Sequence, residues 1–172
     1  MASQTPTFRP AAAEDLPMLH RLVESAYRGE SARAGWTHEA DLLETPRTSA
    51  ETLARIIARP GEVILLALHG EAVAGCVQVS RVADDRAYLG LLAVDPIRQA
   101  GGLGRAIIAA AEAWAVERWG AAVMELSVVS VRAELIAYYE RRGYRLTGET
   151  RPFPAEVEPP LELAVMEKPL GS

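Results

Sequence analysis

The chain has 172 residues, of which 49% are hydrophobic and 24% charged, and this balance suits one domain with a full hydrophobic core. It has no apolar run near the roughly 18–20 residues that a membrane span needs. Its first residues lack a basic region followed by an apolar one, so we do not expect secretion. Because it has a single cysteine, Cys76, neither an internal disulfide nor a zinc site is expected. The net charge of −5 argues against non-specific nucleic-acid binding, and we expect a cytoplasmic protein with no metal, nucleic acid or membrane as partner.

The spacing of apolar residues and of turn residues predicts the elements of the fold. In chain order they are a strand at 7–9, a helix at 15–28, a helix at 48–59, strands at 63–68, 72–81 and 86–94, a helix at 103–119, a strand at 122–128, a helix at 131–142, and strands at 144–148 and 161–166. Asp15 is the expected N-cap of the first helix, and Thr48 with Glu51 forms a capping box for the second. The order predicts an α/β (α+β) fold with a mixed sheet, in one domain spanning residues 7–170.

Two segments show no clear period, 29–47 and 152–160. We expect the first to be a loop or a broken helix, and such segments often border a binding site. Neither segment indicates by its residues what kind of molecule it would bind.

A glycine-rich segment follows the strand that ends at Val94. Gly101, Gly102 and Gly104 leave no side chain where a ligand would approach the backbone closely. The helix after them presents free N–H groups and the positive end of its dipole, which suits a diphosphate, and Arg105 adds positive charge. The plain alternative is a glycine-rich turn that binds nothing.

Two other phosphate-binding loops fit this segment poorly. A P-loop needs Gly-Lys-Ser/Thr, and the segment has no lysine. A dinucleotide fingerprint needs Gly or Ala where this chain has Ile107, although Glu125 does lie where the ribose-binding acid is expected. Because the loop also follows an antiparallel meander, a dinucleotide-binding fold is disfavoured.

Two stretches resemble the GNAT superfamily of N-acetyltransferases. The run Gln99-Ala100-Gly101-Gly102-Leu103-Gly104, preceded by Val94-Asp95-Pro96, resembles its motif A, Gln/Arg-x-x-Gly-x-Gly/Ala. The run Tyr139-Glu140-Arg141-Arg142-Gly143-Tyr144 resembles the end of its motif B, Tyr-x-x-x-Gly-Phe/Tyr. Arg132 departs from the pattern, because many relatives have an asparagine there that contacts the cofactor.

The resemblance implies a mostly antiparallel, twisted sheet of about seven strands flanked by about four helices, and acetyl-CoA as co-substrate without a metal. It also implies that the strands at 86–94 and 122–128 splay apart and that the pantetheine arm of the cofactor lies between them. A main-chain N–H of the strand at 86–94 would polarise the thioester carbonyl. The implied cofactor-binding residues are Leu92, Ala93, Val94, Gln99, Ala100, Gly101, Gly102, Leu103, Gly104, Arg105 and Arg132.

By the same resemblance, Tyr139 is the catalytic general acid. A phenol can protonate the departing thiolate of CoA when its position and environment favour the transfer. The alternative is an aromatic core residue, and for the neighbouring Tyr138 we expect that structural role. Glu30, Tyr88 and Glu125 are candidates for the general base, although each is more simply explained as a surface or packing residue.

The resulting expectation is acetyl transfer from acetyl-CoA to a primary amine of a small molecule, by direct attack in a ternary complex. Two alternatives stay open. The chain could be an acyl-CoA-binding sensor without turnover, or an acetyltransferase that acts on a protein amine. Members of the family are often dimers, so a homodimer is a further expectation, although no interface can be recognised in the sequence.

Overall fold

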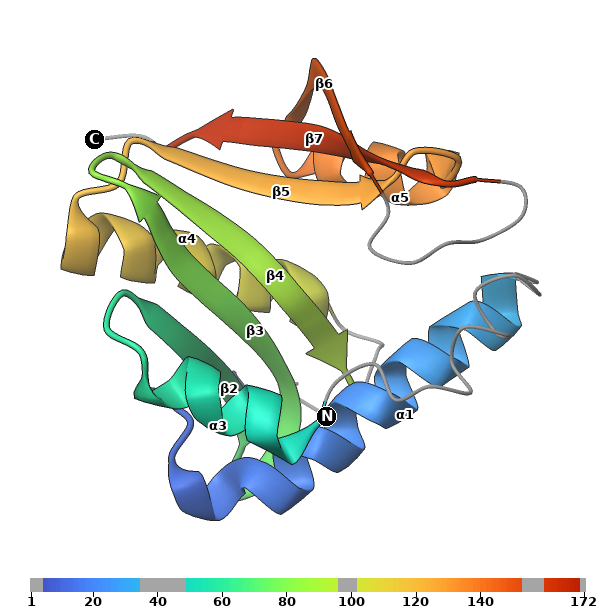
Figure 1. Ribbon diagram of the computed structural model, residues 1–172. Coiled ribbons are helices and arrows are strands. Elements are labelled where there is room, and N and C mark those ends of the chain that lie inside the picture. The colour runs from blue at the N-terminus through green and yellow to red at the C-terminus, as the bar shows by residue number, and fades with distance from the viewer. Residues whose placement is uncertain (1–4, 35–48, 96–101, 153–159, 171–172) are drawn as a thin grey trace.

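The computed structural model describes residues 5–34, 49–95, 102–152 and 160–170 (Figure 1). Within these ranges the chain forms one seven-stranded sheet, in the order β1-β2-β3-β4-β5-β7-β6. The strands are β1 (Thr7–Pro10), β2 (Glu62–His69), β3 (Ala72–Ala83), β4 (Arg86–Val94), β5 (Val123–Val129), β6 (Arg145–Pro152) and β7 (Glu162–Pro169). The helices are a 3-10 turn η1 (Ala13–Asp15) and the α-helices α1 (Leu16–Ala34), α3 (Ala50–Ala58), α4 (Leu103–Trp119) and α5 (Ala133–Arg141).

The expected mixed, mostly antiparallel sheet is confirmed. Strands β2, β3 and β4 form the predicted antiparallel meander, and β4 pairs with β5 in parallel. Strand β7 lies between β5 and β6 and is antiparallel to both. The single parallel pair places the C-terminal ends of β4 and β5 at the same edge of the sheet, which is where both strands deliver their following segments to helices.

The helices cover both faces of the sheet. Figure 1 shows α1 and α3 on the near side and α4 on the far side of β3 and β4. The first core cluster lies under α4 and α5 and includes Leu89, Ile107, Leu126 and Tyr144. The second core cluster lies under α1 and α3 and includes Leu19, Val23, Leu53, Ile64, Leu66 and Cys76. Strands β2 and β3 contribute to both clusters, which explains why β2 is a continuous apolar run.

Two helix starts differ from the sequence prediction. Asp15 ends η1 instead of capping α1: its carboxylate accepts from the Ala12 N–H at 2.8 Å and from the guanidinium of Arg9 at 2.8 and 3.0 Å. The hydrogen bond from Arg9 is the main cause of a lowered pKa of Asp15. Helix α3 is capped by Ser49, whose Oγ accepts from the Thr52 N–H at 3.1 Å, while Thr48 lies outside the described residues.

Two elements, α1 and β6, also have other bounds than the sequence predicted. Helix α1 continues to Ala34, so residues 29–34 are helical instead of forming the start of a loop. Strand β6 begins at Arg145 and reaches Pro152, because pairing with β7 extends it beyond the short apolar stretch. Among the helices that the structure describes, none is both long and apolar enough to cross a membrane.

Candidate active site

Strands β4 and β5 separate soon after they begin to pair. Their parallel ladder covers only Arg86–Tyr88 against Val123–Glu125, although β4 continues to Val94 and β5 to Val129. Figure 1 shows the two strands spreading apart toward their C-terminal ends, on the side where α4 begins. Beyond Tyr88 the described part of the sheet therefore has a notch, in which one edge of β4 pairs with no other strand.

A β-bulge lies in β4 beside this notch. The register passes from Gln78↔Gly90 to Cys76↔Ala93, so two residues of β4 oppose one residue of β3. At the bulge Leu91 has φ 48°, the only positive φ among described non-glycine residues, and such strain tends to occur at functional sites. The bulge also resets the side-chain alternation: Leu92 packs against the first core cluster, and Ala93 lies in the second.

The glycine-rich loop leads into α4 at the open end of the notch. Gly102 is the N-cap of α4, with φ 75° in the left-handed region, and a Cβ built on it would meet no atom of the described residues within 4 Å. The first intrahelical bond runs from the Ala106 N–H to the Gly102 carbonyl at 3.1 Å, so the N–H groups before it are free of helical partners. Open space beside N–H groups that have no helical partner fits a diphosphate. Gln99, Ala100 and Gly101 lie outside the described residues.

Gly104 has a different reason to be glycine. A Cβ at this position would lie 2.8 Å from the hydroxyl oxygen of Tyr138 on α5, which is closer than real contacts allow. The small residue therefore lets α5 approach the first turn of α4, whereas Gly102 has no described atom close to its Cβ position. Leu103, by contrast, is buried in the first core cluster and anchors the start of α4.

The catalytic candidate Tyr139 lies in the last turn of α5. Tyr139 is 7% exposed. Its ring makes edge-on contacts with the ring of Tyr138, at a centroid distance of 5.4 Å, and with that of Tyr144, at 6.0 Å. Because the main-chain N–H of Tyr144 bonds back to the Tyr139 carbonyl at 3.0 Å, the end of α5 holds these rings together. Tyr139 thus belongs to the first core cluster, as do Leu103, the first residue of α4, and, at the margin of the cluster, Leu92.

Tyr144 and the single lysine of the chain share one carboxylate. The Tyr144 hydroxyl donates to Glu112 of α4 at 2.8 Å, and Lys168 Nζ of β7 lies 2.9 Å from the same carboxylate. Burial raises the pKa of Tyr144, and the negative charge of Glu112 raises it further. This network ties α4, β7 and the end of α5 together behind the notch.

The two predicted arginines occupy the outer parts of the site. Arg105 is exposed in the first turn of α4. Arg132 is the N-cap of α5, with a side chain only 11% exposed, and its Nε donates to Glu134 at 3.1 Å. Arg132 therefore has a fixed position just past the end of β5, where its side chain pairs with a carboxylate.

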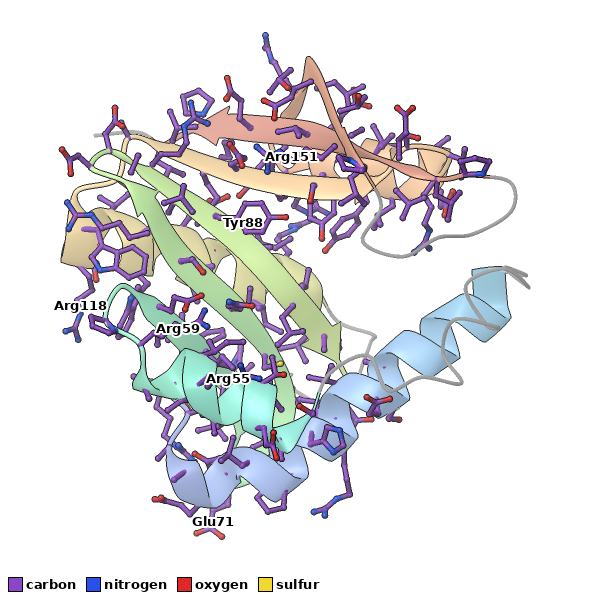
Figure 2. All side chains as sticks on the ribbon, in the orientation of Figure 1. Arg55, Arg59, Glu71, Tyr88, Arg118 and Arg151 are labelled. Carbon is purple, nitrogen blue, oxygen red and sulfur yellow. The ribbon has the colours of Figure 1, made fainter. Side chains whose placement is uncertain are left out.

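Polar side chains gather on the opposite face of the sheet. Because Leu126 faces the first core cluster, Glu125 and Ser127 point the other way. The hydroxyl oxygens of Tyr88 and Ser127 lie 2.5 Å apart and link β4 to β5 where their ladder ends. Figure 2 labels Tyr88 at this point of separation. The sequence singled out Tyr88 but gave no sign of Ser127, because the contact joins residues 39 positions apart.

Glu125, a candidate for the general base, is part of an ion-pair cluster. It is 8% exposed, its Oε1 lies 3.3 Å from Arg86 of β4, and its Oε2 lies 2.9 Å from Arg151 of β6. Glu125 is therefore explained as a link between strands β4, β5 and β6. The side chain of Glu30, the third candidate, lies outside the described part of the chain.

Cys76 is unsuited to covalent catalysis. It is fully buried in β3 within the second core cluster, and burial raises the pKa of its thiol to about 12. Since the thiolate is the nucleophilic form of cysteine, this side chain is not available to carry an acetyl group.

The chain matches the family model described as the acetyltransferase (GNAT) family over residues 18–144. Its structure is similar to that of the ribosomal-protein-S18-alanine N-acetyltransferase from Escherichia coli, with a TM-score of 0.74 and 23% identity over 98% of this chain and 96% of the other. It is also similar to the PaiA N-acetyltransferase from Thermoplasma acidophilum in complex with coenzyme A, with a TM-score of 0.75 and 18% identity over 96% and 99%.

The ribosomal-protein-alanine N-acetyltransferase from Brucella melitensis gives a TM-score of 0.73 and 23% identity, over 95% of this chain and 99% of that one. No curated protein sequence matches the chain. The family match covers most of the chain and includes both the notch and the tyrosine helix. The chain therefore belongs to the acetyltransferase (GNAT) family of acetyl-CoA-dependent N-acetyltransferases.

Proposed function

We propose that this protein, as a single domain over residues 7–170, transfers the acetyl group of acetyl-CoA to a primary amine of a small molecule by direct attack in a ternary complex. The observation that carries the proposal is the early end of the β4–β5 ladder beside the start of α4. Among the described residues, this edge of β4 has no strand partner, and Gly102 at the start of α4 has open space beside it. Together they suit the pantetheine arm and the diphosphate of one extended ligand.

The cofactor-binding residues divide into two groups in this proposal. The segment Gln99–Arg105 holds the diphosphate, with Gly102 giving room and the first-turn N–H groups donating. The main chain of Leu92, Ala93 and Val94 pairs with the pantetheine arm, and the bulge at Leu91 turns a donor of this edge toward the thioester carbonyl. Arg132 contributes a cation at the open end of the notch, just past the end of β5.

Tyr139 acts as the general acid. Its position in the last turn of α5, between two other aromatic rings, limits the freedom of its hydroxyl. The neutral amine attacks the thioester carbonyl, the C–S bond breaks, and Tyr139 donates its proton to the departing sulfur. The attacking nitrogen loses its extra proton to solvent water, and the Tyr139 phenolate regains a proton from solvent. Because no covalent acetyl-enzyme forms, the buried Cys76 has no part in the reaction.

The acceptor amine enters from the face opposite α4 and α5. On that face Tyr88 and Ser127 lie at the point where the strands part. Their hydroxyl oxygens can accept hydrogen bonds from the amine and orient its lone pair toward the thioester. The Glu125 cluster beside them keeps β4 and β6 in fixed positions relative to β5.

The test is a panel of acceptors incubated with acetyl-CoA and the purified protein. The panel contains small amines, amino acids, amino-sugar antibiotics and a peptide with a free N-terminal amine, and the measurements are the release of CoA thiol and the mass of the product. Release with a small amine, accompanied by its acetylated product, supports the proposal.

Three other results would contradict it in different ways. If calorimetry shows tight CoA binding but no acceptor leads to thiol release, the protein would be an acyl-CoA-binding sensor without turnover. Release with the peptide alone would indicate a protein amine as acceptor, as for the ribosomal-protein acetyltransferases of similar fold. Absence of CoA binding would remove the cofactor site itself.

A further inference from the structure

The hydroxyl of Tyr138 lies directly against the first turn of α4. It is 2.8 Å from the position of a Cβ on Gly104, whereas the ring carbon that carries the hydroxyl is 3.9 Å from it. Tyr138 is partly exposed, and its hydroxyl has no hydrogen-bond partner among the described residues. The oxygen therefore projects toward the same helix end where the N–H groups lack helical partners.

A purely structural role explains this arrangement poorly. Alanine at 104 with phenylalanine at 138 would fill the same space with an ordinary contact, because the nearest remaining ring atom is 3.9 Å from the Cβ position. Alanine also suits a helix better than glycine. The chain instead combines a glycine with a hydroxyl that no described group satisfies, and this combination suits a hydroxyl with a ligand to bind.

Arg142, the residue that caps the C-terminal end of α5, adds positive charge beside Tyr138. The guanidinium of Arg142 lies over the Tyr138 ring, 4.6 Å from its centroid. Arg142 Nε is buried and has no hydrogen-bond partner, and Arg142 pairs with no carboxylate in the part of the chain that the structure describes. The stacked cation fixes the ring, so the position of the hydroxyl is fixed as well.

We propose that Tyr138 and Arg142 are cofactor-binding residues, which complete from α5 the site for the diphosphate of acetyl-CoA. The Tyr138 hydroxyl donates to a diphosphate oxygen, and Arg142 holds the ring and attracts the anion. Hydrogen-bond donors come from three places: the first turn of α4, Tyr138 and Arg142. Each has donors without a partner among the described residues, and the oxygens of a diphosphate would accept from them. This inference rests on the proposed function, because it requires the diphosphate to lie at the start of α4.

The experiment measures dissociation constants by calorimetry for CoA, for 3′-dephospho-CoA, which keeps the diphosphate, and for pantetheine, which has no phosphate. Tyr138→Phe removes only the hydroxyl and keeps the ring contacts with Tyr139 and Arg142. The expected result is binding of both diphosphate ligands weakened about tenfold to hundredfold, with pantetheine unchanged, since a hydrogen bond to a charged group is lost.

Tyr144→Phe is the matched control, because it removes a hydroxyl that bonds to Glu112 behind the notch. It is expected to leave all three dissociation constants unchanged. Arg142→Gln, which keeps a flat polar group but removes the charge, is the second test variant. It should weaken both diphosphate ligands and reduce the salt dependence of their binding.

Each alternative outcome overturns the inference in its own way. An equal loss for all three ligands would show a packing role, and a loss for CoA alone would place the hydroxyl at the 3′-phosphate. Unchanged CoA binding in folded Tyr138→Phe and Arg142→Gln proteins would remove both residues from the site while leaving the proposed function intact. If the unaltered protein fails to bind CoA, the proposed function fails together with this inference.

Discussion

Gly104 of α4 and Tyr138 of α5 are in contact, because the tyrosine hydroxyl occupies space that any other residue at 104 would need for its Cβ. We expect Gly104→Ala to lower the free energy of unfolding by about 1–3 kcal/mol through overpacking, since Arg142 and Tyr139 hold the ring on two sides. In the Tyr138→Phe background the same change should cost little, because the nearest ring atom is then 3.9 Å away. Urea denaturation of the four proteins measures this coupling. Equal effects in both backgrounds would contradict the contact.

Tyr139→Phe should lower turnover while leaving acetyl-CoA affinity within about twofold. The ring contacts with Tyr138 and Tyr144 persist in the variant, and only the proton donor is lost, which for general acid catalysis typically costs about a hundredfold or more in rate. Initial rates and calorimetry on the same preparations separate the two quantities. Turnover equal to that of the unaltered protein would exclude Tyr139 as the acid.

Gly102→Val should weaken CoA binding at least tenfold, because the new side chain enters the open space beside the first turn of α4. Valine also resists the left-handed conformation that φ 75° requires, at a cost of about 1–2 kcal/mol. Gly70→Val is the matched control: Gly70 has φ 63° and open space around it, but it lies in the turn between β2 and β3. If both variants lose a similar amount of stability but only Gly102→Val binds CoA more weakly, the result would support the diphosphate site at the start of α4. A CoA defect in both variants would indicate a general effect of strain.

Cys76 should be inert to a thiol reagent in the folded protein at pH 8. Its thiol pKa is raised to about 12 by burial, so the reactive thiolate is absent at that pH. In guanidinium chloride the pKa returns to its ordinary range, and the single thiol should react. Ellman's reagent checks both states, and it also shows that thiol detected during acetyl transfer comes from CoA. Rapid labelling of the folded protein would contradict the buried placement.

The sequence predicted what depends on local pattern. Apolar periodicity gave the order of the elements, and the glycine-rich run marked the start of α4, because left-handed backbone and close approach both require glycine. The predicted cap of the first helix was wrong, because Asp15 binds Arg9 across a turn instead of capping α1. Neighbouring serine and threonine offered equivalent caps for the next helix, and the structure uses Ser49.

The rest depends on contacts between distant segments. The bulge in β4 puts a leucine at φ 48°, where sequence reasoning would expect glycine or asparagine. The place of β7 between β5 and β6 follows from strand pairing that no local pattern encodes. Tyr138 was expected to be structural from its helical spacing alone, and only its approach to Gly104 shows that its hydroxyl reaches the start of α4.

The pairing of Lys168 with Glu112 has a consequence for detecting the reaction. Lysine occurs once in the 172 residues, and its ammonium is held within 2.9 Å of a carboxylate. A protein of this kind has almost no side-chain amine of its own that could compete with an added acceptor. Apart from acetylation of the N-terminal α-amine, its intact mass should therefore stay constant during long incubations. An isotopic acetyl label in excess of one group per chain would report on an added protein substrate instead of on self-modification.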